Sequence, residues 1–324
     1  MPALRFLGAW LVLAAAVLIG AAEAAPKKAA KPDPFANQDL ILRWINGYRA
    51  KPEPALLPEA VRHMSAFGLF KDLDNNGIYI GFMAGVLGAN PGLAAELTAK
   101  LFPMPPEDQV AIIRAIAYSG LPNWQELLRA NIERMPARGV LIDRYLTGKM
   151  PTLGGVPLDQ GPAPLDTLWG YYFATGSYEP VLRIISVLPW SKDTDHVERL
   201  TIGSMAKWTL ASNAQRDKDL LDMVKLAMTH EPKKNAAILR ELIEAVETYE
   251  TGKIRKEAVA AIEQLKAKGP ASTRNMAWWG QAGQTALALG CVVGSALGNA
   301  AIGVPCVIGG AASSAVLKTV TPQP

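Results

Sequence analysis

Apolar residues recur at helical spacing over most of residues 39–270, and this periodicity is the strongest constraint on the fold. Three sets show the pattern i, i+3, i+4, i+7: Val181, Ile184, Ile185 and Leu188; Leu239, Leu242, Ile243 and Val246; and Ala258, Ala261, Ile262 and Leu265. At 3.6 residues per turn, each set forms one apolar stripe along a helix. Alternating apolar and polar runs, typical of strands, are scarce. The sequence therefore predicts an all-α protein.

Prolines divide this helical stretch into blocks. The blocks end at Pro91, Pro136, Pro189, Pro232 and Pro270, at intervals of roughly 40 to 50 residues. Proline ends a helix because it lacks an amide hydrogen and clashes with the preceding turn. Most blocks also contain a glycine break. The pattern predicts an irregular body of helix pairs, either solenoid-like or compact.

Residues 165–189 combine an aromatic-rich helix, a glycine turn and a second apolar helix. The first helix contains Trp169-Gly170-Tyr171, the turn is Gly176-Ser177-Tyr178, and the unit ends at Pro189. The unit resembles a tetratricopeptide repeat, although Pro180 and Val181 stand where that family places an early alanine. The resemblance implies stacked helix pairs with a concave face that binds a protein or peptide partner.

The N-terminus has the pattern of a secretory signal peptide. Arg5 precedes an uncharged apolar run, Leu7 to Ile19, and Ala22-Glu23-Ala24 offers a small-x-small cleavage site. We interpret residues 1–24 as a signal peptide and residues 25–38, rich in proline and lysine, as a linker. The alternative is an uncleaved anchor. A cleaved chain would be secreted across the inner membrane and be periplasmic or envelope-associated.

Composition excludes several classes of protein. Hydrophobic residues make up 50% and charged residues 19% of the chain, which is incompatible with intrinsic disorder. The net charge of +4 is too small to favour a nucleic-acid partner. Signatures of serine hydrolases, NTPases and dinucleotide-binding enzymes are absent from the sequence. The catalytic residues, if there are any, are unknown, and we expect no cofactor apart from a calcium ion at residues 72–78.

Residues 72–78 match the start of a calcium-binding loop, D-x-D-x-N-G. Its predicted ligands are the side chains of Asp72, Asp74 and Asn76 and the carbonyl group of Ile78. The glutamate expected at the twelfth position is replaced by Met83, and Glu59 is one residue that could substitute for it. The alternative is a helix–helix turn whose polar side chains hydrogen-bond their own backbone.

The C-terminal segment, residues 271–324, is rich in glycine and alanine. Two tryptophans precede small residues at every fourth position: Trp278, Trp279, Ala282, Ala286, Gly290, Gly294 and Gly298. A stripe of small residues allows close helix–helix approach, and residues 282–314 resemble the glycine-zipper segments of bacterial envelope proteins. We expect a helical hairpin, and residues 275–317 are a candidate for membrane association. The alternative is a tail packed on the helical body.

The two cysteines, Cys291 and Cys306, are equally spaced from the expected hairpin turn at Gly298-Asn299. An antiparallel pair of helices would place the sulfurs opposite each other, so we expect a disulfide in an oxidising compartment.

These features predict an exported, non-enzymatic binding or scaffold protein that uses a helical surface. Two alternatives remain open. One is an enzyme with a dispersed site near the glycine- and proline-rich loop at residues 146–164. The other is a membrane-associated protein that acts through its C-terminal hairpin.

Overall fold

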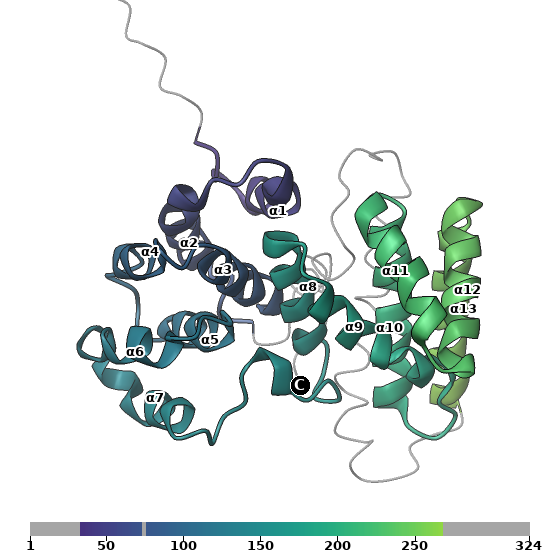
Figure 1. Cartoon of the computed structure of the whole chain (residues 1–324). Coiled ribbons are helices and arrows are strands. Elements are labelled where there is room, and N and C mark those ends of the chain that lie inside the picture. The colour runs from purple at the N-terminus through teal and green to yellow at the C-terminus, as the bar shows by residue number, and fades with distance from the viewer. Residues whose placement is uncertain (1–32, 73–75, 268–324) are drawn as a thin grey trace, which may run out of the picture. The chain divides into compact units, whose positions relative to one another are not determined.

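The computed structural model describes residues 33–72 and 76–267, and Figure 1 shows their arrangement. The chain divides into two units, residues 1–33 and residues 34–324, and every described helix belongs to the second unit. Its described part forms thirteen α-helices without a β-strand among its residues, which confirms the all-α prediction. Within the same residues, no helix is both long and apolar enough to cross a membrane.

Most of the helices are short and follow one another through brief turns. The α-helices are α1 (Gln38–Gly47), α2 (Leu57–Ala66), α3 (Gly77–Ala89), α4 (Ala94–Lys100), α5 (Gln109–Tyr118), α6 (Trp124–Arg129), α7 (Gly139–Leu146), α8 (Ala163–Thr175), α9 (Tyr178–Ser186), α10 (Val197–Ala214), α11 (Lys218–His230), α12 (Lys233–Glu247) and α13 (Thr251–Ala267). The 3-10 helices are η1 (Tyr48–Ala50), η2 (Pro54–Leu56), η3 (Ile132–Arg134), η4 (Pro136–Arg138), η5 (Leu153–Gly155) and η6 (Leu188–Lys192).

Several of the predicted stripes and proline stops are found among the described helices. The apolar stripes of α9 and α12 are buried, as are Ala258 and Ile262 of α13. Helix α3 ends two residues before Pro91, and α12 begins directly after Pro232. The apolar periodicity therefore reports the faces that pack into the core.

Helices α3 and α8 lie against each other at an unusually short distance, and glycines make this approach possible (Figure 1). A methyl group built on Gly81 of α3 would lie 1.9 Å from the carbonyl oxygen of Thr167. On α8, a methyl group at Gly170 would lie 2.1 Å from the carbonyl oxygen of Ile78. Residues 77–87 are all buried. Helix α3 is therefore an interior helix that is apolar on every side.

Helices α8 and α9 form the helix pair that the tetratricopeptide resemblance predicts. Gly176 joins them with a left-handed backbone (φ 68°), and its amide donates a hydrogen bond to the carbonyl oxygen of Tyr172 at 2.7 Å. Helix α8 also contacts α1 and α3, which precede it by a long stretch of chain. The predicted pair of helices is therefore present, and α8 is packed as a central helix.

A polar cluster connects η1, α8 and the start of α11. One terminal nitrogen of Arg49 lies 2.7 Å from both the Tyr172 hydroxyl and Asp217 Oδ2, and the other lies 3.0 Å from Asp219. The Tyr172 hydroxyl donates to Asp217 at 2.7 Å. Burial acts to raise the pKa of Asp217, but the hydrogen bonds from Tyr172 and the Leu220 amide, with the Arg49 charge, hold it below its usual value.

Helix α10 is the centre of the C-terminal part of the described body. It contacts η6, α11, α12 and α13. Lys207 of α10 is 5% exposed, and its ammonium group lies 2.6 Å from Glu241 Oε1 on α12. This ion pair joins α10 to α12.

Several sequence predictions lie outside the described residues. They are the signal peptide (1–24), residues 25–32 of the linker (25–38), and the C-terminal segment with Trp278, Trp279, Cys291, Cys306 and the stripe of small residues from Ala282 to Gly298. The signal peptide, hairpin and disulfide remain predictions.

Candidate functional site

A pocket of about 360 Å³ lies among α5, the α5–α6 turn, the loop before α8, and helices α8 and α9. Its lining consists of Ala117, Tyr118, Gly120, Leu121, Pro122, Trp124, Thr152, Leu153, Gly154, Leu168, Tyr171, Glu179, Pro180 and Arg183. Three aromatic rings and several aliphatic side chains form its walls. A volume of this size is typical of a pocket that holds a small ligand or one large side chain.

Two tyrosines, Tyr118 and Tyr171, line the pocket. The hydroxyl of Tyr171 on α8 donates to the carbonyl oxygen of Ser119 at 3.2 Å, which ties α8 to the end of α5. The hydroxyl of Tyr118 lies 3.3 Å from that of Tyr145, which donates to it. Burial, with a smaller contribution from the negative charge of Glu179, raises the pKa of Tyr171. The Tyr171 phenol is therefore neutral at physiological pH and can serve as a hydrogen-bond partner.

Arg183 of α9 fixes the loop that forms one wall. Its two terminal nitrogens donate to the carbonyl oxygens of Leu153 and Val156, the second at 2.5 Å. Burial lowers the pKa of Arg183, and the nearby charge of Glu179 opposes this shift. The arginine thus satisfies carbonyl groups at and just after η5 that have no strand or long helix to bond with.

Glu179 supplies a charged group at the exposed rim of the pocket. It lies in the first turn of α9 and is exposed. Both terminal nitrogens of Arg183 already donate to the loop, so Glu179 is the more available charge. The site therefore offers an apolar, aromatic interior with a hydrogen-bond acceptor at its mouth. This arrangement suits a ligand with an apolar body and an N–H donor or a positive charge.

Comparison of the chain with protein-family models, curated proteins and solved structures found no match. The pocket and the chemistry of its lining are therefore the basis for a functional proposal.

The sequence identified one wall of this pocket and missed the others. Within the loop at residues 146–164, the alternative location for a site, Thr152, Leu153 and Gly154 line the pocket. Tyr118, Tyr171 and Arg183 belong to no sequence motif that predicts a function. The available signal is the aromatic run around Tyr171, which by itself indicates only a repeat unit.

The structure describes three of the four predicted ligands of the calcium loop. Asp72 is exposed, Asp74 lies outside the described residues, and Asn76 is buried directly before α3. Helix α3 begins at Gly77, so the carbonyl group of Ile78 belongs to its first turn and faces Gly170 of α8. Calcium binding by this loop as a unit remains a prediction.

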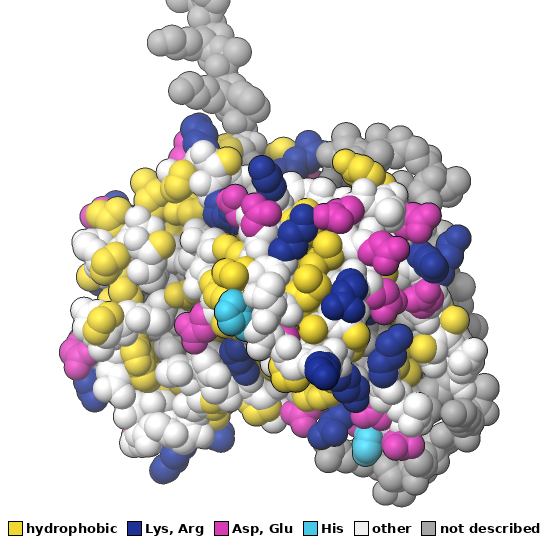
Figure 2. Space-filling model, turned by 45° about the vertical axis from the view of Figure 1, so that its right-hand side comes forward, with side chains coloured by type: hydrophobic (Ala, Val, Ile, Leu, Met, Phe, Trp, Pro, Cys, Tyr) yellow, Lys and Arg dark blue, Asp and Glu magenta, His cyan; other side chains and the backbone are white. Residues whose placement is uncertain are grey.

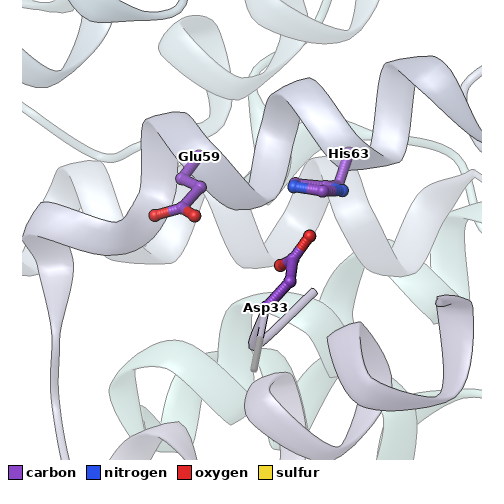
Figure 3. A group of neighbouring side chains, drawn as sticks. All are labelled: Asp33, Glu59 and His63. Carbon is purple, nitrogen blue, oxygen red and sulfur yellow. The ribbon is translucent and has the colours of Figure 1, made fainter. Parts of the chain in front are cut away.

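Glu59, the suggested replacement ligand for that loop, lies on α2. Figure 3 shows it projecting from the same face of the helix as His63, one turn further along. The His63 ring lies between two aromatic rings, with centroid distances of 6.0 Å to Phe35 and 5.8 Å to Phe67.

Proposed function

We propose that this chain is an exported, non-enzymatic binding protein whose pocket between α5, α8 and α9 takes a bulky apolar or aromatic group of a peptide or protein partner. The observation that carries the proposal is the pocket itself: aromatic and aliphatic walls surround about 360 Å³, and one carboxylate stands at its rim. Buried aromatic anchors of this kind contribute most of the affinity in many interfaces.

The charge distribution supports recognition through an apolar group. In Figure 2, acidic and basic side chains are interspersed over the visible face, with hydrophobic side chains between them. A mixed surface gives little long-range attraction for a strongly charged polymer. Affinity would then come from burying the anchor, and the carboxylate of Glu179 would orient a neighbouring N–H group of the partner.

The pocket can be tested with a minimal anchor and a pair of matched variants. Gly154 lines the pocket, whereas its neighbour Gly155 does not, so G154F blocks the mouth and G155F is the control. The probe is N-acetylphenylalaninamide, with N-acetylglycinamide as the ligand control, observed by saturation-transfer NMR. We expect saturation transfer to the phenylalanine probe with wild type and G155F, and its loss with G154F. Equal transfer to all three proteins would refute the proposed site.

Export is tested by the N-terminus of the mature protein. We expect protein recovered from a periplasmic fraction to begin at Ala25. Recovery only from the cytoplasm, with Met1 or Pro2 at the N-terminus, would contradict export.

Membrane association through residues 275–317 is a separate proposal that rests on sequence alone. Fractionation of the full chain and of a variant lacking residues 275–324 tests it. We expect the full chain in the membrane fraction and the shortened chain in the soluble fraction. The same distribution for both would contradict a role for this segment.

A further inference from the structure

Asp166 is a buried carboxylate without a hydrogen-bond partner. It lies in the first turn of α8 and is 0% exposed, and neither of its carboxylate oxygens has a hydrogen-bond partner. An ionised carboxylate in this situation is strongly unfavourable unless a positive charge compensates it. Buried polar groups are satisfied in the great majority of cases, so such an exception calls for a specific explanation.

Asn76 presents a second unsatisfied oxygen. It is 3% exposed and directly precedes α3. Its side-chain nitrogen donates to the carbonyl oxygen of Phe70 at 3.1 Å, while its Oδ1 is buried without a partner. Because the Phe70 carbonyl can only accept, this bond determines which end of the amide is the nitrogen. The atom left over is therefore an oxygen, which can only accept a hydrogen bond or bind a cation.

Both residues lie at the same end of the α3–α8 contact. A methyl group built on Gly77, the residue after Asn76, would lie 2.9 Å from Asp166 Cβ and 3.0 Å from Thr167 Oγ1. The Thr167 hydroxyl donates to the carbonyl oxygen of Ala163 at 2.8 Å, so its own lone pairs remain available. The N-terminal ends of α3 and α8 thus lie against each other where Asn76, Asp166 and Thr167 stand, and the side chains of all three carry oxygen donors.

We propose that Asp166 and Asn76 are ligands of a hard cation, Ca²⁺ in the first instance, with the Thr167 hydroxyl beside them. Oxygen donors of these types are the ligands that calcium prefers, at 2.3–2.6 Å from the ion. The bound cation neutralises Asp166 and satisfies the amide oxygen.

The test compares wild type with D166N, which keeps the shape of the side chain and removes its charge. The full chain is treated with EDTA, dialysed, and titrated with CaCl₂ by calorimetry and by thermal unfolding. D108N is the matched control, since Asp108 is also buried (2% exposed) but accepts a hydrogen bond from Ser65 at 2.6 Å. D166L, which has the same branched shape and no charge, is a second variant in case the amide does not fold.

We expect Ca²⁺ to raise the unfolding temperature of wild type and of D108N, because a ligand bound only to the folded state stabilises it. For D166N or D166L the affinity should fall at least about tenfold, because the charged ligand is lost. A response to Mg²⁺ or Na⁺ in place of Ca²⁺ supports the site and changes its preferred ion. The proposal is overturned if wild type binds none of the three ions at concentrations up to about 10 mM, above the range of weak extracellular calcium modules. Binding by D166N with wild-type affinity overturns it as well.

Discussion

Replacing Gly81 with alanine should destabilise the protein strongly, because this glycine sets the distance between α3 and α8. The new methyl group would lie 1.9 Å from the carbonyl oxygen of Thr167, whereas Cβ atoms essentially never approach another heavy atom within 3.0 Å. The obstacle is a backbone atom in a buried helix, so no side-chain rotation relieves the contact. The two helices have to move apart by about 1 Å, and every contact along their interface loosens.

The size of the effect is set by two opposing contributions. Overpacking of a well-packed core lowers the free energy of unfolding by about 1–3 kcal/mol. Because a whole pair of helices is displaced here, we expect a loss at the upper end of this range. Alanine recovers up to about 1 kcal/mol, because it is the better helix former. The net loss should be about 2 kcal/mol, which lowers the unfolding temperature by about 4–8 °C for a domain of this size.

Thermal unfolding of G81A, followed by circular dichroism at 222 nm, measures this loss, and G252A is the control. Gly252 lies in α13 with no atom within 4 Å of the added methyl group, so G252A should unfold at the wild-type temperature or slightly above it. If G81A unfolds at the same temperature as G252A, α3 and α8 are not in close contact through this glycine.

Three further predictions concern buried charges. Burial raises the pKa of Asp166 well above its usual value. Without divalent cations, the native state is therefore fully stabilised below about pH 4, and its free energy of unfolding falls by up to about 1.4 kcal/mol per pH unit as the pH rises. Urea unfolding from about pH 4 upward should show this fall in wild type and not in D166N. D217N should lower the free energy of unfolding, measured with urea, by about 1–3 kcal/mol, because it weakens a partly buried charged hydrogen-bond network. D219N changes a side chain that is 73% exposed, so it should lower this free energy by less than about 1 kcal/mol. K207M should leave the free energy of unfolding nearly unchanged. E241A should lower it clearly more, because this substitution leaves the buried ammonium group of Lys207 without its partner. Equal losses of stability in the two variants would contradict this account of the ion pair.

The helical class and many element boundaries could be predicted from local sequence. Apolar stripes such as that of α12 report a buried face, and prolines such as Pro91 and Pro232 stop helices, whatever the rest of the chain does. The tetratricopeptide-like turn at Gly176 was also visible, because few residues other than glycine adopt its backbone conformation.

The pairing of α3 with α8 could not be predicted in this way. Helix α3 is apolar all round, so it carries no stripe that points to a partner. Glycines at positions 77, 81 and 85 have the same four-residue spacing as the C-terminal stripe. This spacing marks a close helix contact without identifying the second helix.

The two candidate sites were hidden for a similar reason. Tyr118 and Tyr171 are far apart in the sequence and meet only through the fold. An acidic residue in the first turn of a helix, such as Asp166, ordinarily lies at the surface and interacts favourably with the helix dipole. Only the packing of the first turn of α3 against it shows that Asp166 is enclosed.

The way Arg183 holds the loop before α8 has a consequence for the evolution and redesign of this protein. The arginine donates hydrogen bonds to the main-chain carbonyl oxygens of Leu153 and Val156. These oxygens are present whatever side chains the loop carries. The backbone conformation of the loop therefore depends little on its own side chains, and positions such as Thr152 can be substituted without changing it. A library of substitutions at such positions should therefore yield folded proteins that differ in the partner they select.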